Sequence, residues 1–194
     1  VGFTARRLDD SSQEAKYINT SDTSIYHKGN LLFNYHRVKE AVKQDRRVFL
    51  TEGAMDVLAF EKADLHTALA TLGTACTIEQ IHLLKALHVP VTVCYDGDAA
   101  GQNATYKFAK AAMEAGLTVE IMNNTSGLDP DEIVETYGKQ ELRSLCEKTI
   151  SFIDFLFSYL QKRYNLENYT QKKEYAIEIA DWIRRVSDEF ERKN

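Results

Sequence analysis

A short apolar run that ends in two aspartates most tightly constrains the fold of this chain. Residues 91–95 (VTVCY) are β-branched, aromatic or small apolar residues between Pro90 and Gly97. Such continuous apolarity is typical of a strand buried on both faces of a parallel sheet. Asp96 and Asp98 follow at its carboxyl end, where open α/β sheets bind ligands. Because residues i and i+2 of an extended chain point the same way, both carboxylates can reach one point.

The two carboxylates predict a cation between them. Two unit charges about 4 Å apart repel by roughly 4 kcal/mol at an effective dielectric constant of 20, which is a large part of the stability of a domain. A divalent metal ion would remove this repulsion. The dipeptide Asp-Gly is also common in turns, so a plain turn after the strand is the alternative interpretation.

Strand and helix patterns alternate through the middle of the chain. Strands are predicted at residues 47–51, 66–71, 90–95 and 117–122, and helices at 54–63, 78–87 and 99–115. This alternation predicts an α/β fold with a mainly parallel sheet flanked by helices. Thr77 and Gln80 fit a capping box that opens the second helix, and Gly116 is well placed to end the third.

The two ends of the chain differ from this middle. Short β-like pieces at 1–8 and 16–19 precede a helical pattern at 31–42, and residues 150–194 are predicted to be helical throughout, with two amphipathic helices. We therefore expect a small β-containing segment (1–46), an α/β domain (47–148) and a C-terminal helical subdomain (149–194). Because the chain begins without Met, we expect it to be part of a longer protein.

Charge is distributed unevenly between these parts. Residues 1–47 hold nine lysines and arginines against six acidic residues, whereas residues 48–150 hold seven against fifteen. A basic leading segment beside an acidic middle suits a protein that holds a polyanion with one part and a metal ion with the other. Ordinary solvated faces produce similar imbalances, so the charge pattern does not decide the function alone.

Several classes of protein are disfavoured by what the sequence lacks. No stretch approaches the roughly 20 apolar residues of a membrane span, so no membrane association is expected. The sequence has no phosphate-binding P-loop, no dinucleotide-binding glycine motif, no nucleophile elbow and no zinc-protease motif. Its three cysteines are odd in number and widely spaced, which favours a reducing, cytoplasmic compartment.

Further acidic residues occupy positions equivalent to the aspartate pair. Glu52 follows the first predicted strand of the α/β domain, Asp56 lies one helical turn later, and Asp129 and Asp131 flank Pro130 at a predicted helix start. Asp129 and Asp131 also suit ordinary helix capping. Oxygen ligands favour Mg²⁺ or Mn²⁺. The predicted metal ligands are Glu52, Asp56, Asp96, Asp98, Asp129 and Asp131.

Three of these acidic stretches together resemble a known family. Residues 50–57 (LTEGAMDV), 95–101 (YDGDAAG) and 129–132 (DPDE) resemble the three Toprim motifs, in that order. Upstream, Gly2 and Phe3 with Arg6, residues 16–19 (KYIN) and residues 27–29 (HKG) resemble the RNA-polymerase domain of bacterial DnaG-type DNA primases. The upstream motifs favour primases over other Toprim proteins.

The resemblance implies a DNA primase core that makes short RNA primers from nucleoside triphosphates on single-stranded DNA at the bacterial replication fork. Glu52 would be the acid/base group, and Asp96 and Asp98 would bind the metal ions. These three are the expected catalytic residues. The resemblance also implies nucleotide- and DNA-binding roles for Arg6, Lys16, Tyr17, Asn19 and Lys28.

The resemblance also implies partners and parts beyond this chain. A zinc-binding domain would precede it, with Zn²⁺ only there, and the replicative helicase would bind a C-terminal domain outside it. The chain itself is expected to be a monomer. Two alternatives stay open: a Toprim module of a topoisomerase or nuclease, which would cleave DNA, and a non-catalytic module that binds metal or nucleotide.

Overall fold

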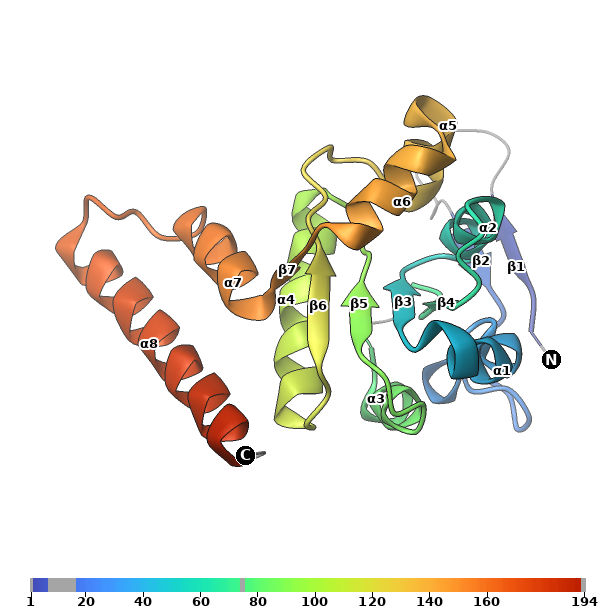
Figure 1. Cartoon of the computed structure of the whole chain (residues 1–194), viewed down its shortest axis with the longest axis horizontal. Helices are drawn as coiled ribbons and strands as arrows, with labels where there is room; N and C mark the ends of the chain where they lie inside the picture. Colours follow the sequence, from blue (N-terminus) through green and yellow to red (C-terminus); the bar gives the residue numbers. More distant parts are fainter. Residues whose placement is uncertain (1, 7–16, 74–75, 193–194) are drawn as a thin grey trace.

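A five-stranded sheet forms the centre of the computed structural model, which describes residues 2–6, 17–73 and 76–192 (Figure 1). The strand order is β4-β3-β5-β6-β7, and all pairs are parallel except β6 with β7. The strands are β3 (Val48–Thr51), β4 (Ala68–Ala70), β5 (Val91–Val93), β6 (Val119–Met122) and β7 (Thr149–Ser151). The expected mainly parallel sheet is confirmed.

Helices cover both faces of this sheet because successive strand residues point to opposite sides. Val48 and Leu50 belong to one apolar core, and Phe49 between them belongs to the other. The first core is covered by α1 (Tyr35–Asp45), α3 (Ile78–Lys85), α4 (Ala99–Glu114) and α7 (Phe152–Gln161). The second is covered by α2 (Ala54–Lys62), α5 (Pro130–Tyr137) and α6 (Lys139–Glu147).

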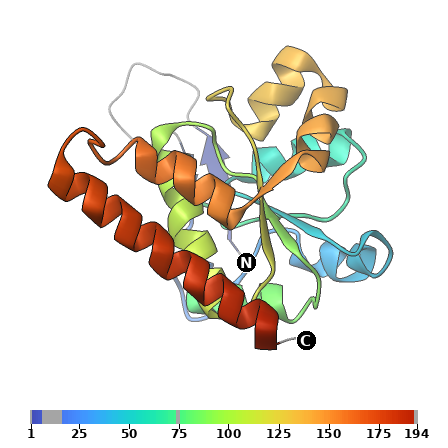
Figure 2. The ribbon, with the colours of Figure 1, turned by 60° about the vertical axis from the view of Figure 1, so that its left-hand side comes forward.

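The last helix, α8 (Tyr169–Arg192), lies alongside α7 (Figure 2). Its Trp182 meets Phe152 of α7 edge to face, with ring centroids 5.0 Å apart. Lys110 of α4 and Arg185 both lie over the Trp182 ring, at 6.0 Å and 5.2 Å from its centroid. The two C-terminal helices thus pack against the sheet domain through α4.

The prediction that residues 150–194 are helical throughout was wrong at its start. Thr149–Ser151 forms β7, in which Ile150 pairs with Ile121 and Ser151 with Glu120 of β6. The exposed edge of β6 supplies unpaired backbone groups, and pairing with them outweighs the helical pattern that α7 continues.

The N-terminal part contains a two-stranded antiparallel sheet of β1 (Thr4–Arg6) and β2 (Tyr17–Asn19), followed by the short helix η1 (Lys28–Asn30). The helix predicted from residue 31 begins only at Tyr35. Phe33 is instead extended and donates its N–H to the carbonyl of Ala70 at 2.9 Å, which extends the edge of β4.

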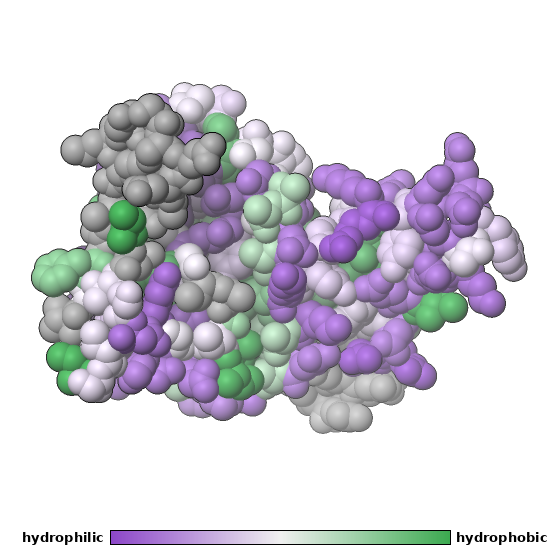
Figure 3. All heavy atoms as spheres, turned by 180° about the vertical axis from the view of Figure 1, so that it is seen from behind, coloured by the Kyte–Doolittle hydropathy of each residue, from purple (hydrophilic) through white to green (hydrophobic). Residues whose placement is uncertain are grey.

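Hydrophilic side chains dominate the end of the molecule formed by the C-terminal helices when it is seen from behind (Figure 3). Within the part of the chain that the structure describes, no helix combines the length and apolarity needed to cross a bilayer.

Candidate active site

Three helices begin at the carboxyl edge of the sheet. Strands β3, β5 and β6 are in register, with Val48 beside Val91 and Val91 beside Val119, so their carboxyl ends lie together. Helices α2, α4 and α5 start from the connections after these strands, with Gly53, Asp98 and Asp129 as their N-caps. The edge therefore collects acidic residues from three separate stretches of sequence.

Two of the acidic residues cap helices. Asp98 Oδ1 accepts the N–H of Gly101 at 2.7 Å, and Asp129 Oδ1 accepts the N–H of Glu132 at 2.7 Å. The positive ends of the helix dipoles stabilise carboxylates at these positions. The capping role that the sequence suggested for Asp129 is confirmed, and Asp98 has the same role.

Glycines allow the backbone segments of this edge to approach one another. A Cβ on Gly97 would lie 2.8 Å from the backbone nitrogen of Gly127. A Cβ on Gly101 would collide with the carbonyl oxygen of Asp96. Gly101 therefore lets the start of α4 lie against the end of β5, and Gly97 lets the β6–α5 loop lie against the same segment.

Asp56 is the most deeply buried of these acids, with 5% of its surface exposed. Its Oδ2 accepts the N–H of Gly53 at 2.9 Å. Burial and, to a smaller extent, the charges of Asp129 and Asp96 raise the pKa of Asp56 to about 8, although the Gly53 hydrogen bond opposes the shift. Without a cation, this carboxyl group keeps its proton at neutral pH.

Asp96 and Glu52 lie in the same partly buried, negatively charged environment as Asp56. Burial, followed by the charges of Glu52, Asp129 and Asp98, raises the pKa of Asp96 to about 7. Burial also raises the pKa of Glu52, while a hydrogen bond from the N–H of Asp96, 3.5 Å from Glu52 Oε1, opposes the shift. We call this electrostatically coupled group the acidic cluster: Glu52, Asp56, Asp96, Asp98 and Asp129.

Asp131 differs from the members of the acidic cluster because a cation faces it. Lys62 Nζ of α2 lies 3.6 Å from Asp131 Oδ1. The Asp131 side chain is buried, and the same oxygen accepts no hydrogen bond within the described residues. Five of the six predicted metal ligands thus belong to the acidic cluster, and the sixth, Asp131, faces a lysine.

The donor atoms of the acidic cluster fit a hard divalent cation. All are carboxylate oxygens, which Mg²⁺ and Mn²⁺ prefer. Among residues 2–6, 17–73 and 76–192, no three acidic, histidine or cysteine side chains converge closely enough to form a complete metal site. The raised pKa values of Asp56 and Asp96 show that full ionisation is costly in this arrangement, and a cation would relieve that cost.

The structure describes four of the five residues that were predicted to bind nucleotide or DNA. Lys28 Nζ lies 3.8 Å from where a Cβ on Gly73 would stand, and Gly73 lines the same cavity as Glu52. The structure therefore places Lys28 beside one wall of the cavity that Glu52 also lines. In the β1–β2 pair, Arg6 is opposite Tyr17, and Asn19 is opposite Thr4. Lys16 lies outside the described residues.

Two residues of the site were not predicted. The charge of Glu132 contributes to the raised pKa of Asp96. Its spacing from Asp129 matches a capping box, which was a usable signal. Asn124, buried after β6, donates from Nδ2 to the carbonyl of Leu128 at 2.7 Å and so holds the loop that leads to Asp129. Nothing in the sequence marked Asn124.

Comparison with known families agrees with this arrangement. Residues 49–134 match a family described as Toprim-like, residues 1–39 the N-terminal domain of the DNA primase catalytic core, and residues 153–194 the DnaB-helicase binding domain of primase. Fold and site therefore define a Toprim-type protein, and the flanking matches connect it with primases.

Individual relatives lead to the same family. A DNA primase of Lactococcus lactis is 37% identical over 188 residues, covering 96% of this chain and 29% of the relative. The Aquifex aeolicus primase structure (zinc-binding and RNA polymerase domains) has a TM-score of 0.73 at 34% identity, covering 99% of this chain and 48% of that one. A DnaG primase catalytic domain bound to single-stranded DNA has a TM-score of 0.76 at 29% identity, covering 95% and 60%.

The matches to the three family models and to curated DNA primases support a bacterial DnaG-type DNA primase fragment. The chain spans only part of its curated relatives, 29% of the Lactococcus lactis primase and 39% of the Aquifex aeolicus primase. The match over 153–194 also corrects one expectation, because the helicase-binding part was placed in a domain outside this chain. The matched residues are those of α7 and α8.

Proposed function

We propose that this protein is a primase catalytic core, a nucleotidyltransferase that makes short RNA primers on single-stranded DNA from nucleoside triphosphates. It would use Mg²⁺ or Mn²⁺ and work in the bacterial cytoplasm at the replication fork. The observation that carries the proposal is an acidic cluster from three sheet connections, with carboxyl pKa values raised by burial and mutual charge. Its fold and family are those of primases.

Each acidic residue has a proposed role. Asp96 and Asp98 would hold the metal, with Asp56, Asp129 and Asp131 completing the binding surface. A bound divalent cation supplies charge stabilisation at the reacting phosphate. Glu52 would accept the proton of the primer 3′-hydroxyl as that oxygen attacks the α-phosphate and pyrophosphate leaves. Burial raises the pKa of Glu52, and a higher pKa makes a carboxylate a stronger general base.

The N-terminal residues would hold the nucleic acid. Arg6, Lys16 and Lys28 would contact template or nucleotide phosphates, and Tyr17 and Asn19 would contact the nucleotide. Such contacts predict single-stranded DNA binding that weakens steeply with salt. The helices α7 and α8 would contact the replicative helicase, and the chain would act as a monomer.

The Asp98→Asn variant tests the proposal. Asparagine caps helices as well as aspartate does, so we expect the fold to persist while metal-dependent primer synthesis falls by about 10³-fold. Asp45→Asn, at the exposed end of α1, is the matched control and should stay active. Synthesis is measured on single-stranded DNA with Mg²⁺ and all four nucleoside triphosphates. Equal activity of the two variants, or cleavage of the DNA instead of synthesis, would contradict the proposal.

A further inference from the structure

A cavity of about 240 Å³ adjoins the acidic cluster on the α4 side. Glu52 forms one wall, Thr71, Gly73 and Cys76 of the β4–α3 connection form another, and α4 forms a third with Asn103 and Lys107. The largely buried rings of Tyr95 and Phe108, with centroids 6.2 Å apart, contribute to the apolar lining. Glu52 thus belongs both to the cavity lining and to the acidic cluster.

We propose that this cavity receives the nucleobase of a nucleoside triphosphate whose phosphates lie at the acidic cluster. The inference rests on the proposed function and adds a binding subsite to it. Apolar walls with a few placed polar groups are typical of ligand pockets. The volume is below the about 300 Å³ at which pockets for whole small molecules begin. It therefore suits one part of a nucleotide.

A chain of hydrogen bonds fixes the Asn103 amide in this cavity. Arg163, which can only donate, bonds the hydroxyl oxygen of Tyr159. The Tyr159 hydroxyl donates in turn to Asn103 Oδ1 at 3.0 Å. Tyr159 is itself held between Tyr106 and Phe155, with ring centroids 4.9 Å and 5.5 Å away.

This arrangement leaves the Asn103 amide nitrogen for a ligand. Within the described residues it donates no hydrogen bond to protein, and Asn103 lines the cavity. Its N–H groups match the ring nitrogens and carbonyl oxygens on the edge of a base. A single amide against apolar walls accepts different bases, because all share such acceptors and a flat apolar face.

Two lysines at the cavity could contact the phosphates of such a nucleotide. Lys107 lines the cavity on the exposed side of α4. Lys28 lies next to Gly73 on the opposite wall. Because Glu52 lines the cavity and is also electrostatically coupled to the other acids, a nucleotide whose base is in the cavity can direct its phosphates toward the acidic cluster. A template base inserted here would not need that connection, so the nucleotide is the favoured occupant.

The test compares two leucine substitutions at the start of α4. Ala100 lines the cavity and Ala99 does not, and both are exposed, so neither change overpacks the core. Binding of ATP and of tripolyphosphate, each with Mg²⁺, is measured by calorimetry on the 194-residue chain. We expect Ala100→Leu to weaken ATP binding by about tenfold and to leave tripolyphosphate binding unchanged. Ala99→Leu should change neither.

A second pair of variants uses neighbouring amides. Asn103→Ala should weaken ATP binding, whereas Gln102→Ala, one residue earlier and not lining the cavity, should not. Thermal unfolding of each variant verifies the fold.

Equal ATP affinity for Ala100→Leu and Ala99→Leu, and for Asn103→Ala and Gln102→Ala, would overturn the proposal. So would a loss confined to a single-stranded oligodeoxythymidylate, which would assign the cavity to template. Failure of the proposed function has a different signature: Asp98→Asn would leave both ATP and tripolyphosphate binding unchanged.

Discussion

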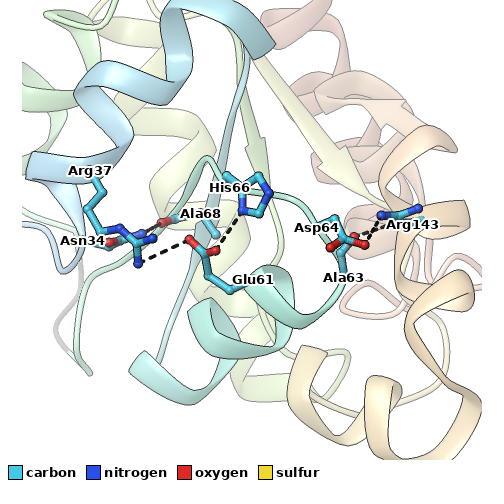
Figure 4. A network of polar contacts seen from close by, with 8 residues as sticks. All are labelled: Asn34, Arg37, Glu61, Ala63, Asp64, His66, Ala68 and Arg143. Carbon is cyan, nitrogen blue, oxygen red and sulfur yellow. Dashed lines mark hydrogen bonds and ion pairs between the residues drawn. The ribbon is translucent and has the colours of Figure 1, made fainter.

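The two ends of helix α2 hold acidic residues in opposite electrostatic situations. At its start, Asp56 belongs to the acidic cluster and has a pKa raised to about 8 by burial. At its end, Glu61 Oε2 lies 2.8 Å from His66 Nδ1, and Glu61 Oε1 lies 3.7 Å from Arg37 (Figure 4). Asp64, just beyond the helix, lies 2.5 Å from Arg143.

This difference separates acids that hold the fold together from acids that need a ligand. The end of α2 is tied to α1 by Arg37 and to α6 by Arg143, whose Nε also donates to the carbonyl of Ala63 at 2.5 Å (Figure 4). At the start of α2 the side chain of Asp56 is met by a backbone N–H and by further carboxylates. Acids placed together at a cost to stability are typical of functional sites.

The largest expected effect is on the pH dependence of stability. The folded pKa of Asp56 is about 8 against an ordinary value of 3.8, so between these values the folded state holds a proton that the unfolded state has lost. The free energy of unfolding of the metal-free protein should therefore fall as pH rises from about 4 to 8, by as much as about 1.4 kcal/mol per pH unit for each such proton. Urea unfolding at several pH values measures this slope.

The Asp56→Asn variant should flatten this slope, and Asp64→Asn at the other end of α2 should leave it unchanged. If both variants keep the slope of the parent protein, the contrast between the two ends of α2 is wrong.

Gly101→Ala tests whether close backbone approach builds the acidic cluster. The new Cβ would collide with the carbonyl oxygen of Asp96, so we expect a loss of about 1–3 kcal/mol in the free energy of unfolding together with weaker Mg²⁺ binding. Gly138→Ala, where no atom lies within 4 Å of the added Cβ but φ is +86°, is the control for backbone strain alone. It should lose stability without losing Mg²⁺ affinity.

The smallest expected effect concerns the C-terminal end of α2, where the acidic side chains form ion pairs. Arg143→Ala removes the ion pair with Asp64 and the bond to Ala63, and because Asp64 is largely exposed we expect a loss of only about 1 kcal/mol. Mg²⁺ affinity should not change. Thermal unfolding measures the stability and calorimetry measures the Mg²⁺ affinity. Loss of Mg²⁺ binding in Arg143→Ala would contradict the claim that this end of α2 has no part in metal binding.

Much of this picture follows from local sequence. The apolar runs around Val48 and Val91 predicted their strands because buried parallel strands need nothing more than continuous apolarity. The capping pair of Thr77 and Gln80 was confirmed because it depends on neighbours three residues apart. Asp129 was predicted as a cap for the same reason.

Features decided by distant partners could not be predicted. Ile150 precedes the apolar stripe of α7, and only the free edge of β6 makes it part of a strand. Asp131 matches the family motif as well as Asp129 does, but the rotation of α5 places it against Lys62 of α2. The Asn103 amide in the cavity beside Glu52 is fixed by Tyr159, which lies 56 residues away in the sequence.

The central claim is that the acidic cluster binds a divalent cation. The most direct test is the number of protons that Mg²⁺ binding releases. Calorimetry at pH 7 in buffers of different ionisation enthalpy gives the number of protons released. Because the pKa of Asp56 is about 8 and that of Asp96 about 7, binding should release roughly one proton per protein, and release should disappear above pH 9. Mg²⁺ binding without proton release, or with release unaffected in Asp56→Asn, would contradict the account.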